Sequence, residues 1–265
     1  MPVPWWLRLF LLINVIQDAG IGVSGWLSPA GIVIPLKGLT PLNARFVASL
    51  YLGGGVVILV AAFARRAVDT RLALYSFLAI TVLVLVMTLA YWDRFTVDGV
   101  PWLWLTTYVV DPVVATIALA SLRLTRPGEP GRHGLTGLFV GQSAVLGVVG
   151  LALLSAAPAM LDAWPWTITP ILARVYAAFL LAFAIGAGLA AVERRPAALA
   201  GFLLGSLVLF ALSFAASLIH QSRFDDGISS WLWFTVHGLS LVAFAAALVT
   251  LRRPDIHARP VAVQS

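Results

Sequence analysis

The chain contains no cysteine and few charged residues. Without cysteine it has no disulfide framework, no thiolate nucleophile and no cysteine-ligated metal or cluster. Only 11% of its 265 residues are charged, whereas a soluble domain has about 25%. The chain therefore cannot cover a water-facing surface. Its 17 basic residues exceed its 11 acidic ones, but basic residues set the topology of membrane proteins, so we expect no nucleic-acid partner.

Long apolar runs make up most of the chain, which is 61% hydrophobic with a mean hydropathy of +0.98. A run of eighteen or more apolar residues spans roughly 30 Å of hydrocarbon. In that solvent the backbone groups must pair within each segment, so the runs should be helices. We expect an all-α, polytopic membrane helix bundle in the lipid bilayer, with eight transmembrane helices. The predicted ranges are 5–26, 41–63, 71–91, 101–122, 135–156, 170–191, 197–219 and 230–251.

The basic residues are distributed unequally between the two sets of connections. Twelve of the seventeen lie on one side: Arg8, Arg65, Arg66, Arg71, Arg123, Arg126, Arg132, Arg194, Arg195, Arg252, Arg253 and Arg259. The other side has Lys37, Arg45, Arg94, Arg174 and Arg223. Because the cytoplasmic side carries the excess, both the N-terminus and the C-terminus should be cytoplasmic. The abundance of Ala, Leu, Val and Arg suggests a GC-rich bacterial genome, so the expected location is the bacterial cytoplasmic membrane.

Two halves of the chain resemble each other at an offset of 129 residues. The segment "TPLNARF" from Thr40 matches "TPILARV" from Thr169, and "WLWLT" from Trp102 matches "WLWFT" from Trp231. From Thr40 to Thr106, 20 of 67 positions are identical to those of the second half, and ten of the twenty are Thr, Pro, Arg, Phe or Trp. The match is weakest in the first and fifth helices. We interpret the pattern as an internal duplication.

The duplication predicts two tandem parallel four-helix repeats. Four passes return the chain to the same side, so both repeats enter the membrane in the same direction, as in some transporters. The predicted units are residues 1–122 and 135–251, joined by a cytoplasmic linker at 123–134 and followed by a cytoplasmic tail at 252–265. The linker is rich in Pro, Gly and charge, which is typical of a loop.

Aromatic and small residues suggest two further structural roles. Eight tryptophans fall at the outer level of the predicted helices, where such rings usually anchor at the membrane interface. They are Trp26, Trp92, Trp102, Trp104, Trp164, Trp166, Trp231 and Trp233. Glycines gather at 52–56 and 184–190, in equivalent helices. Since small residues allow close approach, these two helices are predicted to form the central contact.

Two carboxylates interrupt the apolar runs. Asp18 lies near the middle of the first helix, with Asn14 and Gln17 on the same face, and Asp111 lies near the middle of the fourth. A carboxylate at the bilayer centre costs roughly 2.5–3.5 kcal/mol on insertion scales, which points to function. The four residues are candidates for an ion or proton site. Alternatively, each Asp is hydrogen-bonded within the bundle and the two acids never meet, and Asp111 belongs to the local adjustment around Pro112.

Arginines form a second candidate site at the outer face. Arg45 and Arg174 lie one turn inside equivalent helices, and Arg94 and Arg223 lie in equivalent outer loops. The guanidinium of Arg donates two parallel hydrogen bonds to a phosphate or carboxylate, so these four residues could bind an anion or lipid headgroups. The competing interpretation pairs them with nearby aspartates.

Histidines offer little for metal or haem. His220 and His237 flank the last outer turn, at different depths. A metal or haem site needs several converging ligands, so we expect no metal and no cofactor, and assign these two residues to a polar wall. No zinc-protease motif, nucleophile elbow or cysteine is present, and no catalytic residue is assigned.

Three functions remain open on these residues. The first is a small-solute or ion transporter with a midplane acidic site. The second is a non-catalytic membrane scaffold or accessory subunit, whose protein partner the sequence does not identify. The third is an enzyme acting on a lipid-linked substrate at the outer face through His220, Arg94, Arg223 and Asp225. Whether the chain is an enzyme stays open, and the missing catalytic motifs count against it.

Overall fold

The computed structural model describes residues 1–265 apart from 33, 35, 37–38, 93–101, 124–133 and 253–265. Within the described residues it contains helices and no strand. Eight helices are long and apolar enough to cross a membrane, and each begins and ends within two residues of its predicted range. They are α1 (Trp5–Leu27), α2 (Pro41–Ala62), α3 (Arg71–Ala90), α4 (Trp102–Arg123), α5 (Thr136–Ser155), α7 (Pro170–Ala190), α8 (Pro196–Ile219) and α9 (Ile228–Arg252).

Short helices occupy some of the connections. These are η1 (Pro29–Gly31), η2 (Ala67–Thr70), α6 (Ala157–Ala163) and η4 (Gln221–Arg223). None of them is long enough to span a bilayer.

The starts of α2 and α7 follow from the same local chemistry. Proline at the first helical position lacks an N–H that would have had no partner there. The preceding threonine supplies the missing acceptor: Thr40 Oγ1 accepts from the N–H of Asn43, and Thr169 Oγ1 from the N–H of Leu172, each at 3.3 Å. Side-chain capping of this kind fixes where a helix begins.

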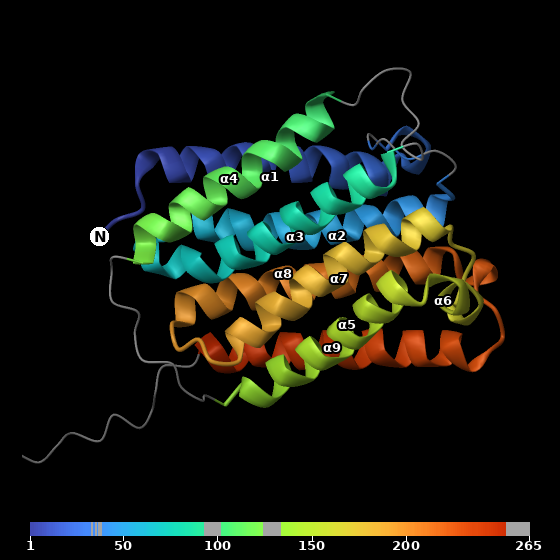
Figure 1. Ribbon diagram of the computed structural model, residues 1–265. Coiled ribbons are helices and arrows are strands. Elements are labelled where there is room, and N and C mark those ends of the chain that lie inside the picture. Colours follow the sequence, from blue (N-terminus) through green and yellow to red (C-terminus); the bar gives the residue numbers. More distant parts are fainter. Residues whose placement is uncertain (33, 35, 37–38, 93–101, 124–133, 253–265) are drawn as a thin grey trace, which may run out of the picture.

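The eight long helices form one bundle (Figure 1), in which α1 packs on α2, α5 on α7, α3 on α4 and α8 on α9. Further contacts join residues before 124 to residues after 133: α2 packs on α8, and α3 packs on α7 and, less extensively, on α8. The first residue of α1 and the last residue of α9 lie at the same end of the bundle (Figure 1). The buried core is therefore continuous across both halves of the chain.

The predicted central contact between the glycine segments of α2 and α7 is wrong. Gly53 lies against the α8 backbone: a Cβ placed there would come 2.7 Å from Leu209 Cβ and 3.0 Å from the carbonyl oxygen of Gly205. On α7, Gly186 makes room for Ser76 of α3 and Phe202 of α8. Glycine thus allows α2 and α7 to approach other helices closely. Between α2 and α7 themselves, aromatic rings meet instead, as in the contact of Tyr51 with Phe179.

Two of the eight outer tryptophans are core residues, not interface anchors. Trp164 and Trp166, just before α7, are only 5% and 3% exposed. Trp166 donates from Nε1 to Asn43 Oδ1 at 2.6 Å, and the hydroxyl of Tyr176 donates to the same oxygen at 3.0 Å. Asn43 in turn donates from Nδ2 to the carbonyl of Thr167 at 3.2 Å. The segment before α7 thus packs inside the bundle, where it provides hydrogen-bond partners for the buried amide of Asn43.

Candidate functional site

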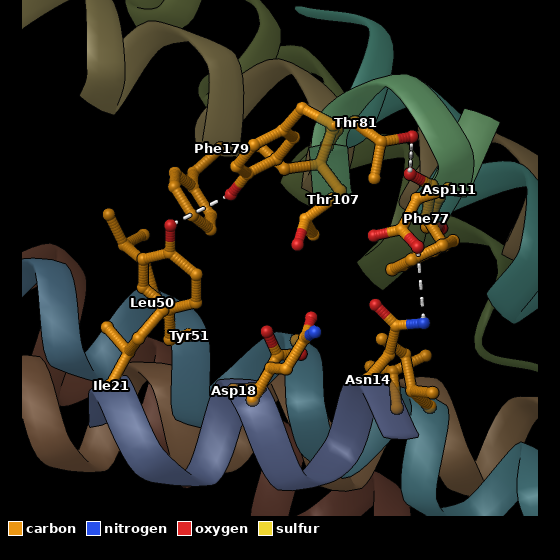
Figure 2. A pocket seen from close by; sticks show the side chains of 18 of the residues that line it. Asn14, Asp18, Ile21, Leu50, Tyr51, Phe77, Thr81, Thr107, Asp111 and Phe179 are labelled. Carbon is orange, nitrogen blue, oxygen red and sulfur yellow. Dashed lines mark hydrogen bonds between the residues drawn. The ribbon is translucent and has the colours of Figure 1, made fainter. Parts of the chain in front are cut away.

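The four polar residues predicted for an ion or proton site line one cavity. Asn14, Gln17 and Asp18 reach it from α1, and Asp111 reaches it from α4. Asn14 donates from Nδ2 to Asp111 Oδ1 at 3.5 Å and to the carbonyl of Phe10 at 3.1 Å. Figure 2 shows the carboxylates of Asp18 and Asp111 and the hydroxyl of Thr107 pointing into the same space. The structure therefore brings the two acids to a common site.

The two acids differ in their surroundings. Asp111 is 6% exposed and accepts the bond from Asn14. Asp18 is half-buried and borders the cavity. Among the described residues, no side chain donates a hydrogen bond to the Asp18 carboxylate, and Figure 2 marks none. A carboxylate at this depth ordinarily has such partners, so Asp18 is left with capacity for a ligand.

Two glycines of α2 shape the space around Asp18. A Cβ at Gly55 would lie 3.0 Å from Asp18 Cβ, so glycine is needed where α1 and α2 meet beside the acid. The neighbouring Gly54 also lines the cavity, and a Cβ there would meet nothing within 4 Å. One glycine thus positions Asp18, while the other leaves the cavity open next to it.

Helix α4 continues through Pro112, immediately after Asp111. Proline lacks the N–H that would bond the carbonyl of Tyr108, so one backbone bond of the helix is missing beside the acid. Asp111 therefore has two features of the hydrogen-bonded alternative: it stands beside Pro112, and it accepts a bond from Asn14 of another helix.

The cavity has a volume of about 700 Å³, within the usual range of ligand sites. Its walls come from α1, α2, α3, α4, α7 and α8. Tyr51 and Tyr108 form a hydroxyl–hydroxyl bond of 2.9 Å at one side, and the ring of Phe179 lies edge-on to Tyr51 at 4.9 Å. Apart from the residues already named, most of the lining is apolar or aromatic.

Sequence reasoning missed the aromatic part of this site. Tyr108 precedes Asp111 by three residues, so helical spacing alone could have placed both on one face. No comparable signal identifies Phe179, Phe183 or Phe202, which reach the cavity from α7 and α8. Their contribution depends on how the second half packs on the first.

The outer arginines do not form a single cluster in the described part of the chain. Arg45 donates from Nε to the carbonyl of Trp26 at 3.1 Å and from its guanidinium to Nε2 of His220. Arg174 donates to the carbonyl of Pro170 at 2.8 Å, with its guanidinium 4.6 Å from the ring centre of Tyr91. Arg223 is exposed in η4, and Arg94 lies outside the described residues. The predicted pairing of Arg45 and Arg174 with aspartates is not seen in the described residues.

The contact with Arg45 defines the protonation state of His220. A guanidinium can only donate, so Nε2 of His220 must accept and the ring must be neutral. Partial burial lowers the pKa of His220 below its ordinary value of 6.5, and the positive charges of Arg45 and Arg223 lower it further. His220 is thus a neutral acceptor at the C-terminal end of α8.

His237 serves a different contact. It is buried in α9, where its Nδ1 bonds to the carbonyl of Trp233 at 2.9 Å and its ring packs 5.2 Å from Phe210. The two histidines therefore do not form one polar wall: each has its own partners. Within the described residues, no group of three or more His, Cys, Asp or Glu side chains is arranged to hold a metal ion.

No protein family, curated protein or solved structure matches this chain. The eight apolar helices are compatible with an integral membrane protein.

Proposed function

We propose that the chain is a permease-like protein of the bacterial cytoplasmic membrane, built from two tandem four-helix repeats, with its passage for a small solute or ion at the Asp18 cavity. The repeat is supported by the pairing of helices. Under the 129-residue offset, α1 to α4 correspond to α5, α7, α8 and α9. The contacts α1–α2 and α3–α4 then correspond to α5–α7 and α8–α9, and α2–α8 corresponds to α7–α3.

Hydrogen bonds at equivalent positions also support the duplication. Trp104 Nε1 donates to Thr88 Oγ1 at 3.1 Å, and Trp233 Nε1 donates to Ser217 Oγ at 2.9 Å. In each half, the accepting hydroxyl donates in turn to a backbone carbonyl four residues earlier at 2.8 Å. The tryptophans and the hydroxyl residues are each separated by the same offset of 129 residues.

The outer ends of the halves exchange contacts reciprocally. Arg45 of the first half binds His220 of the second, and Arg174 of the second half lies over Tyr91 of the first. Arg45 corresponds to Arg174, and Tyr91 to His220, under the same offset. A pseudo-twofold axis between the halves, along the membrane normal, accounts for this exchange.

The orientation follows from the positive charges. The described arginines of the predicted cytoplasmic side lie at the end of the bundle where α1 begins and α9 ends, for example Arg66 and Arg195. This arrangement favours cytoplasmic termini, because cytoplasmic loops carry the excess of Arg and Lys.

A passage for solutes is supported above all by the Asp18 carboxylate, which faces a cavity of about 700 Å³ and accepts no side-chain hydrogen bond from the described residues. Placing a carboxylate at this depth costs free energy, and a bound cation or proton would offset that cost. Asp111, on the same cavity and held by Asn14, provides a second negative charge. A non-catalytic scaffold would need neither acid at this position.

Purified protein in liposomes tests the proposal. The liposomes contain pyranine to follow internal pH, and a proton gradient or external ²²Na⁺ is applied under a potassium–valinomycin voltage clamp. We expect proton or sodium flux above that of protein-free liposomes. The flux should fall in Asp18→Asn and in Asp111→Asn, and it should fall furthest in the double variant.

Ser240→Ala is the matched control, because Ser240 occupies the position in the second half that corresponds to Asp111. This variant should retain the flux. If wild-type protein conducts neither ion, or if the double variant conducts as well as wild type, the proposal is rejected. Purification with a stoichiometric partner, together with the absence of flux, would instead support the scaffold function.

A further inference from the structure

We infer that the ligand of the Asp18 cavity is a hydrophobic organic cation, with its positive charge at Asp18 and Asp111 and its apolar body against the aromatic wall. This inference rests on the proposed function in taking the cavity as the passage, and it adds the chemical class of the solute. It is argued from the charges, the available hydrogen-bond donors, the wall and the size of the cavity.

The charges around the cavity have one sign. Asp18 and Asp111 are the ionisable acids on its lining, and no Arg, Lys or His is found among the described lining residues. In surroundings of low dielectric constant, an unpaired charge of either sign is costly. A cationic ligand compensates the carboxylates, whereas an anionic ligand would add a further negative charge.

Most of the hydrogen-bond donors on the lining already have acceptors in the protein. Asn14 donates to Asp111 and to the carbonyl of Phe10. The indole of Trp104 donates to Thr88. Three hydroxyls donate to carbonyls of their own helices: those of Ser24, Ser76 and Thr81. An anionic ligand would therefore find only neutral donors such as Thr107, while a cation finds the acceptors of Asp18 unoccupied.

The aromatic part of the lining suits an apolar body. Phe179, Phe183 and Phe202 reach the cavity from the second half of the chain, and Phe77 reaches it from α3. Aromatic faces attract cations and also bury hydrocarbon. An inorganic ion would use none of this surface.

The size of the cavity points to the same class of ligand. A dehydrated metal ion requires several oxygen ligands at 2–2.6 Å on all sides. The described lining of this cavity of about 700 Å³ holds two carboxylates and is mostly apolar or aromatic, so it offers few such ligands. The cavity can accept an organic molecule whose charged group lies at the acids.

Tetraphenylphosphonium is a suitable probe because it is large, aromatic and permanently positive. Tetraphenylborate has nearly the same shape and the opposite charge. Binding of each radiolabelled ion to purified full-length protein in detergent micelles is measured by equilibrium dialysis, with protein-free micelles as the baseline. We expect saturable binding of tetraphenylphosphonium and none of tetraphenylborate.

The Asp18→Asn variant should bind tetraphenylphosphonium at least about tenfold more weakly, equivalent to about 1.4 kcal/mol. Asp226→Asn is the control, since it removes an exposed carboxylate outside the cavity. Phe179→Leu, which keeps an apolar side chain but removes the ring, should also weaken binding. Tryptophan fluorescence and gel filtration establish that each variant is folded.

The inference is overturned if tetraphenylborate binds as well as tetraphenylphosphonium, or if folded Asp18→Asn binds like wild type. Its failure is distinguishable from that of the proposed function. Ion flux that depends on Asp18, without tetraphenylphosphonium binding, leaves the permease standing and rejects the organic cation. Binding that depends on Asp18, without flux, retains the ligand class and rejects the permease.

Discussion

The first half of the chain contributes small residues to the cavity lining, whereas the second half has large aromatic residues at the corresponding positions. Gly54 of α2 leaves open space, and its counterpart in α7 is Phe183. Ala73 of α3 lines the cavity, and its counterpart in α8 is Phe202. The rings of Phe183 and Phe202 lie 6.1 Å apart, and both are buried. Small residues in one half and large ones in the other thus produce different interiors from similar helix pairings.

The two aspartates that lie within long helices, Asp18 of α1 and Asp111 of α4, both line the cavity. At the positions of Asp18 and Asp111, the second half has Gly147 and Ser240. A carboxylate is tolerated in a membrane interior where a cavity, water or a partner can compensate it, and not in a packed aromatic core. At this cavity the acids come from the first half of the chain, and the phenylalanines of α7 and α8 come from the second.

The largest effect is expected at Asn43, whose counterpart in the second half is Leu172. Asn43→Leu removes the acceptor shared by Trp166 and Tyr176. Each buried donor left without a partner costs about 1–3 kcal/mol, so the free energy of unfolding should fall by about 3 kcal/mol. SDS titration in mixed micelles, followed by tryptophan fluorescence, measures this loss.

Leu172→Met is the control for Asn43→Leu, because a volume-conserving apolar exchange costs less than about 1.5 kcal/mol. An equal loss in both variants would show that the two positions have the same role. The two halves would then not differ in what the residue at this position contributes to stability.

Filling the cavity should remove the main difference between the interiors. Gly54→Phe places in the first half the residue that the second half has at Phe183. The new ring enters open space, so folding should be retained, while tetraphenylphosphonium binding should weaken at least about tenfold, or about 1.4 kcal/mol. Equilibrium dialysis provides the measurement.

Gly141→Phe is matched to this variant, since Gly141 of α5 is exposed and also has nothing within 4 Å of its Cβ position. It should bind the probe like wild type. Retained binding in Gly54→Phe would mean that the ligand lies elsewhere than in the cavity.

An equal effect in the two halves is expected for the paired tryptophans. Thr88→Val and Ser217→Ala each remove the acceptor of one indole, Trp104 or Trp233. Each should lower the free energy of unfolding by about 1 kcal/mol, the net value of one hydrogen bond. Clearly unequal losses in the same micelle titration would argue against structural equivalence of these positions.

The smallest effect is expected at the outer contacts, where His220 corresponds to Tyr91. Since the pKa of His220 is lowered in the folded protein, the unfolded chain binds this proton more readily. The neutral ring therefore contributes stability fully above pH 6.5, and this contribution is lost as the pH falls through the lowered pKa. This loss of stability is measured by thermal unfolding in micelles between about pH 7.5 and 4.5.

The variant His220→Tyr would pair Arg45 with a tyrosine, as Arg174 is already paired with Tyr91. Subtracting its pH profile from that of wild type isolates the histidine from the other groups that titrate in this range. Identical profiles would show that His220 does not contribute, and a loss of stability on raising the pH would contradict the contact with Arg45.

Several features were predictable from local sequence. Eight apolar runs and two Thr-Pro pairs identified the helices, because length and capping chemistry act within a segment. The polar residues of the candidate site stood out, since Asp18 and Asp111 are costly in lipid. The roles of Trp164 and Trp166 were not predictable, as a ring at the same depth can face lipid or the core.

By itself, the sequence determined the membrane-compatible class, the helix boundaries and the position of the acids along α1 and α4, because hydrophobic length and single-residue costs are local properties. Only the tertiary structure decided that Asp18 and Asp111 face one cavity, that α7 and α8 close it with phenylalanines, and that the glycine segments pack on α8 and α3. These outcomes depend on which helix faces meet, and that is set by side-chain volumes contributed from distant parts of the chain.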